Sequence, residues 1–400
     1  MSEPAASTAG ALSDLRVVEM GQLIAGPFCG QLLGDMGAEV IKIEPPGAGD
    51  PMRVWGQGAP VWWDVIARNK RSVSLDLRQV EGQGLARRLI AQADVLIENF
   101  KPGTLEGWGL APDDLRRDNP GLIVVRMSGY GQTGPYAARA GFGGVAEAMG
   151  GWRRIVGDPD RPPSRMGVSI GDSLTATYGC IGVLSALHHR HRTGQGQVID
   201  AALYESVLQV MEGMVAEYAV AGVTRQRSGA VLPGIAPSNV YPCLDGEYMI
   251  AANQDAVFRR LCVAMGRPDL ADDPRYIDHV SRGAHQAQLD DLIAAWTIKL
   301  TIQEVEAAML TASVPAGRLF APADMLEDPH FASREAIISM DHPRWKNFKM
   351  QGVFPKLSAT PGAVRSIAPQ VVGEHNAEIL GGRLGLSSQD LERLRDARVI

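Results

Sequence analysis

Short apolar runs alternate with amphipathic segments over the first two hundred residues. The apolar runs are rich in β-branched residues and bounded by turn residues, at 15–20, 39–44, 72–77, 94–100 and 122–129. The segments between them have helical patterns, at 29–38, 81–93 and 112–120. Strands that alternate with helices indicate βαβ units and a parallel sheet covered on both faces. The pattern therefore predicts a large, doubly wound α/β domain.

The longest helical pattern occupies residues 165–194, which read RMGVSIGDSLTATYGCIGVLSALHHRHRTG. A loop rich in Gly and Pro leads into it, and Gly194 follows a basic last turn, as is typical of a helix C-terminus. We predict a helix of roughly five turns with Asp172 at or within its first turn. The unpaired amides and the helix dipole at that end favour an ionised carboxylate by about 0.3–1 kcal/mol. From this stretch alone, a capping role for Asp172 is the simpler interpretation.

The second half of the chain predicts a smaller domain of mixed structure. Residues 194–222 predict one more strand and a long amphipathic helix. Helical patterns at 255–266 and 286–300 lie in a smaller α+β region, and a last helix begins near Ser387. With 400 residues the chain has enough material for two cores. We expect a large domain (1–225), a small domain (226–335) and a C-terminal segment (336–400).

Composition excludes several classes of protein. The chain is 45% hydrophobic and 21% charged, as in an average globular protein, and its net charge of −6 gives no footprint for nucleic acid. No run of about eighteen apolar residues occurs, so we expect no membrane span. Residues 1–10 lack the features of a signal peptide, and we interpret them as a disordered lead-in to a cytoplasmic protein. The scattered cysteines predict reduced thiols, with no metal site and no disulfide framework: Cys29, Cys180, Cys243 and Cys262.

Ligands of such sheets bind beyond the carboxyl ends of the strands, where the strand order reverses. The loop at 21–30 lacks GxGxxG spacing, which disfavours a nicotinamide or flavin cofactor. Asn99, Phe100 and Lys101 stand together in a second loop, and a glycine-rich loop at 128–136 allows a ligand to approach closely. Together these loops suit a large, flat, partly charged ligand such as a nucleotide-bearing thioester.

Five sequence motifs follow one another along the chain, and their order carries a family resemblance. They read VVEMGQLIAGPFCGQLLGDMGAEVIKIEPPGAGDPMR, RNKRSVSLDLR, DVLIENFKPG, SGYGQTGPY and RPPSRMGVSIGDSLTATYG. In this order they resemble class III CoA-transferases, also called the CaiB/BaiF family, which include formyl-CoA:oxalate CoA-transferase and are related to α-methylacyl-CoA racemase. The resemblance covers residues 15–210 and resumes more weakly at 241–248 and 373–380. It implies a Rossmann-like large domain to which the C-terminal segment returns, and an obligate, interlocked homodimer.

The resemblance also implies a mechanism. Asp172 matches the family's aspartate, which attacks the donor thioester and passes through a mixed anhydride and an aspartyl-CoA thioester. Acyl-CoA and a small carboxylic acid are then substrates, and no cofactor is bound permanently. Covalent catalysis divides one difficult exchange into easier steps. Gly167, Gly171 and the loop at Asn253 and Gln254 are candidates for stabilising the oxyanions, although simple turn geometry explains the glycines equally well.

Matching this sequence residue by residue to the motifs of the resembling family indicates which residues line the CoA pocket. Its expected lining comes from three loops: Gln22, Ile24 and Ala25; Leu75 and Arg78 at the adenine and its phosphate; Asn99 and Phe100 along the pantetheine or diphosphate. One position departs from the pattern, because Gly107 stands where the family commonly has an arginine. The missing phosphate contact falls to Lys101 or Arg78. Trp108, the next residue, either stacks on the ligand or packs under the loop.

Two alternatives share the fold. A racemase needs an acid/base pair, typically a histidine with an aspartate, but Phe142 occupies the histidine position and no histidine precedes His188. A homologue that only binds acyl-CoA is the other alternative, and the retained Asp172 argues against it. Segment 141–172 looks more like members that use succinyl-CoA and short dicarboxylates. An arginine could hold the far carboxylate of such an acid, the candidates being Arg53, Arg71, Arg154 and Arg165.

Overall fold

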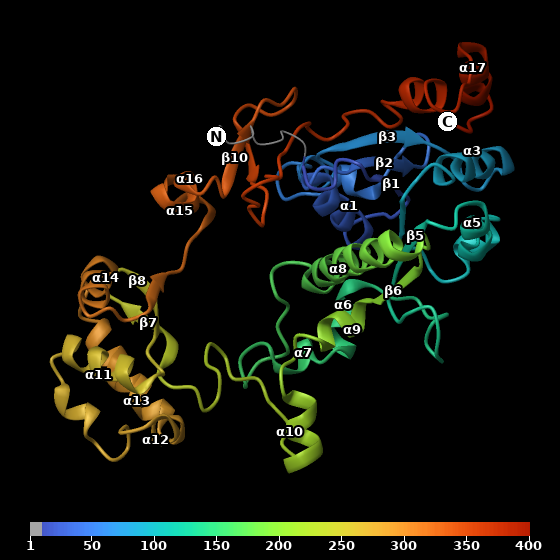
Figure 1. Cartoon of the computed structure of the whole chain (residues 1–400). Helices are drawn as coiled ribbons and strands as arrows, with labels where there is room; N and C mark the ends of the chain where they lie inside the picture. The colour runs from blue at the N-terminus through green and yellow to red at the C-terminus, as the bar shows by residue number, and fades with distance from the viewer. Residues whose placement is uncertain (1–9) are drawn as a thin grey trace, which may run out of the picture. The chain divides into compact units, whose positions relative to one another are not determined.

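A computed structural model describes residues 10–400 of the chain (Figure 1). The predicted disordered lead-in falls on residues 1–9, outside the described residues. The chain forms two compact units. The first comprises the chain up to Trp152 together with Met166–Ala221 and Ser333–Ile400, and the second comprises Arg153–Arg165 and Gly222–Ala332. The last part of the chain therefore belongs to the same unit as the first.

A six-stranded parallel sheet forms the centre of the first unit. In chain order its strands are β1 (Arg16–Glu19), β2 (Glu39–Glu44), β3 (Lys70–Ser74), β4 (Val95–Glu98), β5 (Ile123–Ser128) and β6 (Val198–Ala202). They lie in the order β3-β2-β1-β4-β5-β6, so the winding reverses between β1 and β4. The strand predicted at 72–77 is shifted toward the N-terminus, because Asp76 already turns the chain by accepting a hydrogen bond from the Arg78 amide.

Alternating side chains of the strands supply two apolar layers. Val17 and the strand side chains on the same face of the sheet pack against α1 (Ala25–Asp35) and α8 (Ile170–Thr193). Val18 and the strand side chains on the opposite face pack against α3 (Val80–Ile90) and α5 (Pro112–Asp118). The C-terminal η3 (Ala377–Gly381) and α17 (Ser388–Asp396) complete this second layer. The predicted doubly wound α/β domain is confirmed. The helix predicted to begin near Ser387 is also confirmed, and its Ser387 hydroxyl accepts a hydrogen bond from the Asp390 amide.

Helix α8 is the long helix predicted from residues 165–194. It begins after Ser169, carries Asp172 in its first turn, and ends at Gly194 with φ of 73°. Its 24 residues make almost seven turns, more than the five expected. Within residues 10–400, α8 is the one helix long and apolar enough to cross a membrane by length and composition. The core helix of a globular protein passes the same test, and α8 packs along α1 and β5.

Shorter helices connect these elements. They are η1 (Pro51–Val54), α2 (Trp62–Ile66), α4 (Thr104–Gly107), α6 (Gly143–Met149), α7 (Trp152–Ile155), α9 (Leu203–Leu208) and α10 (Met214–Ala221). The single long helix expected after β6 is wrong. Glu212 has φ of 52°, a backbone conformation outside the helix, and this residue separates α9 from α10.

The second unit has its own antiparallel sheet and apolar core. The strands β7 (Ser238–Cys243), β8 (Gly246–Ala251) and β9 (Ala316–Arg318) lie in that order. Its helices include α11 (Asp255–Ala264), η2 (Pro268–Ala271), α12 (His279–Ala284), α13 (Gln286–Thr297), α14 (Ile302–Thr311) and α15 (Pro322–Glu327). The helices predicted at 255–266 and 286–300 are confirmed. Arg282 is fully buried and bonds the carbonyl oxygens of Ala236, Tyr276 and Asn253.

The C-terminal part follows α16 (Pro329–Ser333) and begins with a hairpin of β10 (Ile337–Met340) and β11 (Phe348–Gln351). It then runs beside β3, the edge strand of the large sheet. The Asn69 amide donates to Ser366 O at 3.1 Å, and the His375 amide donates to Ser72 O at 2.9 Å. These bonds cover an edge that would otherwise expose unpaired backbone groups.

Candidate active site

Asp172 lies beyond the carboxyl ends of the sheet strands. The opposite end of α8 is fixed by Arg190, whose Nη1 lies 2.9 Å from Asp94 Oδ1 and donates to Gly121 O at 3.3 Å. Both partners precede the strands β4 and β5, so α8 runs antiparallel to them. Eighteen residues separate Asp172 from Arg190, about 27 Å of helix, whereas the six residues of β5 span about 20 Å. The first turn of α8 therefore projects past the edge where such sheets bind ligands.

Glycine backbone lies directly against the Asp172 carboxylate. A Cβ added to Gly143, the first residue of α6, would lie 2.2 Å from Asp172 Oδ2. Gly171 packs on α6 and α9, since a Cβ added there would lie 3.4 Å from Val207 Cγ2 and 3.6 Å from Glu147 Cγ. Glu147 is a fully buried carboxyl group that the sequence analysis did not single out. The space beside the Asp172 carboxylate thus requires glycine at position 143.

Gln22 and Asn99 meet at the reversal of strand order between β1 and β4. The side chain of Asn99 accepts a hydrogen bond from the Gln22 amide at 2.7 Å and donates one to Gln22 O at 2.8 Å. A Cβ on Gly21 would lie 3.0 Å from Asn99 Oδ1, so glycine admits this approach. The structure brings together two of the residues expected in the CoA pocket, at the edge where the fold places ligands.

The other expected pocket residues lie on the same first unit. Ile24 precedes α1 and Ala25 is its buried first residue, while Leu75 is buried in the core beside β3. Phe100 is partly buried and meets Trp108 edge to face, with ring centroids 5.0 Å apart. Trp108 thus packs against the loop and core rather than standing free.

The cations expected at the phosphates are at the surface. The side chain of Arg78 is 81% exposed and pairs with Asp76 at 2.8 Å. Its hydrogen bonds lower the pKa of Asp76 to about 2. Lys101 is exposed, and a Cβ on Gly107 would meet no atom within 4 Å. The space beside Gly107, where the family resemblance leads us to expect an arginine, is therefore open.

The four candidate arginines differ sharply in their surroundings. Arg53 is engaged by Glu44 and by backbone carbonyl oxygens, and Arg71 pairs with both Glu39 and Glu378. Arg154 bonds Gln226 Oε1 at 3.0 Å, and Arg165 is exposed. Arg154 and Arg165 belong to the second unit, as do Asn253 and Gln254, the residues that lead into α11.

Two features of the site were not foreseen from the sequence. A buried ionic cluster underlies the loop that contains Gln22, and its members include Lys42, Glu44 and Asp50. Lys42 and Glu44 alternate with apolar residues in β2, which is the one sequence signal for buried charge. The second feature is a pair of cysteines that are far apart in sequence: Cys29 Sγ lies 3.5 Å from Cys180 Sγ.

The cysteines are free thiols, three of them buried and Cys180 half-buried. The hydrogen bond to Cys180 and burial raise the pKa of Cys29. Within residues 10–400, no cluster of three or more His, Cys, Asp or Glu side chains is arranged to hold a metal ion.

Comparison with known proteins agrees with this architecture. The model of CoA-transferase family III matches residues 12–376, and the chain belongs to that family. It is a CoA-transferase, built on the fold of the CaiB/BaiF proteins.

Three relatives illustrate the match. The succinyl-CoA–D-citramalate CoA-transferase of Chloroflexus aurantiacus is 55% identical over 97% of this chain and 98% of its own length. The β subunit of succinyl-CoA–L-malate CoA-transferase from the same organism is 42% identical, over 97% and 98%. The crystal structure of a CaiB/BaiF family protein from Brucella suis superposes with a TM-score of 0.83 at 36% identity, covering 94% of this chain and 99% of that one.

Proposed function

We propose that this enzyme transfers CoA from succinyl-CoA to a short dicarboxylic acid, with D-citramalate the first acceptor to test. The observation that supports it most directly is the placement of Asp172, in the first turn of α8 and against the backbone of Gly143. The names of the two curated relatives support the choice of donor and the size of the acceptor.

Asp172 is the proposed nucleophile. Its carboxylate oxygen attacks the thioester carbonyl, the carbon–sulfur bond breaks, and a mixed anhydride forms as CoA leaves as thiolate. The thiolate attacks the aspartyl carbonyl, which releases succinate and leaves an aspartyl-CoA thioester. The acceptor carboxylate attacks the aspartyl carbonyl of this thioester, the carbon–sulfur bond breaks, and a second mixed anhydride forms as CoA thiolate leaves. The thiolate then attacks the acceptor carbonyl of the anhydride, which forms the new acyl-CoA and restores the Asp172 carboxylate. No proton is consumed, and water must be kept from the anhydride.

The first unit is the proposed CoA-binding part. Gln22 and Asn99 form the part of the pocket at the strand reversal, flanked by Ile24, Ala25, Leu75 and Phe100. Arg78 and Lys101 are assigned to the phosphates, in place of the arginine expected at Gly107; both are at the surface.

The second unit is the proposed source of acceptor recognition. Arg53 and Arg71 pair with carboxylates of the chain. The distal carboxylate of the acceptor is assigned to Arg154 or Arg165, which are exposed and close to Asp172 in sequence. Asn253 and Gln254 of the same unit are assigned to the oxyanion. Replacing Arg154 or Arg165 with Ala should raise the KM for a dicarboxylic acceptor at least tenfold more than the KM for a monocarboxylic one.

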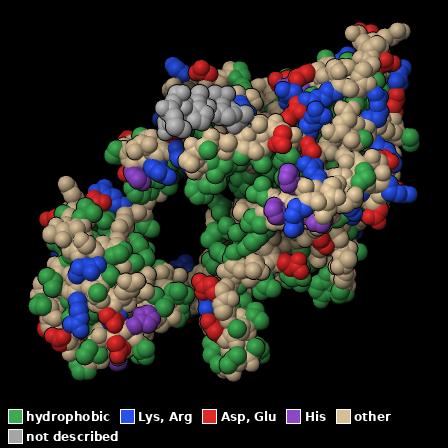
Figure 2. Space-filling view, viewed as in Figure 1, with side chains coloured by type: hydrophobic (Ala, Val, Ile, Leu, Met, Phe, Trp, Pro, Cys, Tyr) green, Lys and Arg blue, Asp and Glu red, His purple; other side chains and the backbone are tan. Residues whose placement is uncertain are grey.

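We further propose that the enzyme is an interlocked homodimer in the cytoplasm. Apolar side chains of the first unit remain half exposed or more on α8 (Ile181 and Leu184) and on α10 (Val215, Tyr218 and Val220). Figure 2 shows hydrophobic side chains gathered along α8 on the face in view. A second copy of the chain would cover these faces, as large exposed apolar patches mark interaction sites.

The experiment that tests the catalytic proposal is mass spectrometry after incubation with succinyl-CoA and trapping with hydroxylamine or borohydride. Modification of the peptide that carries Asp172, lost in Asp172→Asn with the fold intact, is the expected result. An unmodified protein that exchanges the α-proton of a 2-methylacyl-CoA in deuterated water would instead establish a racemase. The exposed Phe142, which cannot exchange a proton, argues against that outcome.

A further inference from the structure

The loop between β1 and α1 has a backbone that its own sequence does not favour. Leu23 has φ of 62°, in the left-handed region that is unfavourable for a residue with a side chain. Such a conformation persists only when the surroundings impose it. The neighbour of Leu23 is Gln22, whose backbone is held by Asn99 at the proposed CoA pocket.

The constraint on Leu23 comes from one buried carboxylate. The Leu23 amide donates to Asp50 Oδ1 at 3.1 Å, and the Met52 amide donates to the same oxygen at 2.9 Å. Asp50 Oδ2 lies 2.9 Å from Lys42 Nζ, and Lys42 also donates to Gly21 O. Asp50 and Lys42 therefore hold the loop on both sides of Gln22.

Both groups of this pair are buried and charged. Burial by itself would lower the pKa of Lys42, but the carboxylates of Asp50 and Glu19 raise it above its ordinary value. Burial would likewise raise the pKa of Asp50, but Lys42 and the amides of Met52 and Leu23 lower it. A rigid ion pair of this kind stays assembled across the physiological pH range, so it keeps the loop in a single geometry.

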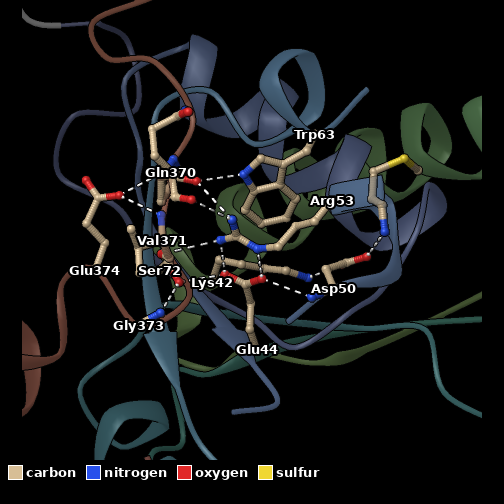
Figure 3. A network of polar contacts seen from close by, with 12 residues as sticks. Lys42, Glu44, Asp50, Arg53, Trp63, Ser72, Gln370, Val371, Gly373 and Glu374 are labelled. Carbon is tan, nitrogen blue, oxygen red and sulfur yellow. Dashed lines mark hydrogen bonds and ion pairs between the residues drawn. The ribbon is translucent and has the colours of Figure 1, made fainter. Parts of the chain in front are cut away.

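The pair belongs to a larger network that reaches the C-terminal segment (Figure 3). The Asp50 amide donates to Glu44 Oε2 at 2.9 Å, and Arg53 Nε donates to the same oxygen at 2.7 Å. Arg53 Nη1 and Trp63 Nε1 both donate to Pro369 O, at 3.2 and 2.7 Å. The end of the chain thus anchors the residues that fix the loop.

We propose that Asp50, supported by Lys42, is a positioning residue for CoA: it imposes the strained conformation of Leu23 and thereby fixes the position of Gln22 in the pocket. This inference rests on the proposed function, in which the loop lines the CoA pocket. Neither Asp50 nor Lys42 contacts the ligand. Loss of the carboxylate releases Leu23 to a relaxed conformation, so CoA binding weakens while Asp172 is untouched.

The test compares Asp50→Asn with Asp64→Asn, using coenzyme A itself as the probe in titration calorimetry of the full chain. Asp64 is a matched control because it is equally buried and binds Arg344 and Trp345 of the C-terminal segment, but it does not touch the loop. We expect Asp50→Asn to weaken CoA binding about tenfold. Asp64→Asn should lower the melting temperature as much and leave CoA affinity within twofold of wild type.

Rescue separates positioning from general stability. Glycine adopts the left-handed conformation without strain, so Leu23→Gly combined with Asp50→Asn should recover most of the lost affinity. If Asp50→Asn does not fold, Leu23→Pro imposes the loop change directly with the buried charges in place, because proline has no amide to donate to Asp50 and its ring fixes φ at about −65°, outside the left-handed region. That variant should also bind CoA at least tenfold more weakly.

The outcomes are distinct. Wild-type CoA affinity in Asp50→Asn or in Leu23→Pro overturns the inference alone. Equal losses of affinity in Asp50→Asn and Asp64→Asn, tracking stability, overturn it too. No binding of CoA by the wild-type enzyme overturns the proposed function and the inference together.

Discussion

Gly143 offers the sharpest test of the site geometry. Its backbone lies against the carboxylate of Asp172, and a Cβ at position 143 would lie 2.2 Å from Asp172 Oδ2. Ordinary carbon–oxygen contacts begin at about 3.3 Å. The Gly143→Ala substitution therefore forces a displacement of about 1 Å, shared between the carboxylate and the first turn of α6.

The expected effect is on the chemical step rather than on folding. A misplacement of about 1 Å at a reacting group can reduce the rate about a hundredfold. Gly143 is the first residue of a helix and its φ lies outside the left-handed region, so alanine adds no backbone strain. We expect kcat for CoA transfer to fall about a hundredfold, with a melting temperature close to that of wild type.

The assay is steady-state CoA exchange from succinyl-CoA, with thermal melting measured on the same samples. Gly84→Ala is the control, because a Cβ at Gly84, inside α3, would meet no atom within 4 Å. It should preserve activity and stabilise the helix by about 0.5–1 kcal/mol. Wild-type kcat in Gly143→Ala, at unchanged stability, would refute the close approach between residue 143 and Asp172.

Three further substitutions test other parts of the argument. Asn99→Ala removes both hydrogen bonds to the Gln22 backbone, so the KM for succinyl-CoA should rise about tenfold and kcat should change less. Initial-rate kinetics measure both constants, and an unchanged KM would contradict a role for these two hydrogen bonds in CoA binding. Leu184→Glu places a charge on the exposed apolar face of α8 and should lower the melting temperature of the interlocked dimer, whereas a monomeric wild type in light scattering would contradict the proposed assembly. Burial raises the pKa of Cys262 from 9.0 to about 11, so folding favours the neutral thiol. Stability is then complete below pH 9 and falls as pH rises toward 11; urea unfolding should show a shallower decline in Cys262→Ala, and parallel curves would exclude this cause.

The sequence by itself determined those helices, strands and helix ends that depend on residues close together along the chain. Alternating apolar runs and helical patterns placed the parallel strands, because the period of two or 3.6 residues decides which side chains share a face. Asp172 and Gly194 mark the two ends of α8 for equally local reasons, the free amides of the first turn and the left-handed conformation after the last. The break at Glu212 escaped prediction, since apolar residues continue on both sides of it.

Tertiary structure decided everything that joins distant positions. Gln22 and Asn99 are 77 residues apart, and Cys29 and Cys180 are 151 apart. No periodicity or spacing connects such pairs, because the contact depends on strand order and helix packing.

The candidate arginines show the same limit. A guanidinium looks available to a substrate in the sequence, whereas the fold gives Arg53 to Glu44 and to Pro369, 316 residues away. Folding also required that the buried charges of β2, Lys42 and Glu44, be paired, since burying an unpaired charge costs far more free energy than burying a paired one. Local patterning therefore specifies which residues can act, and the packed structure determines which of them are committed to holding the protein together.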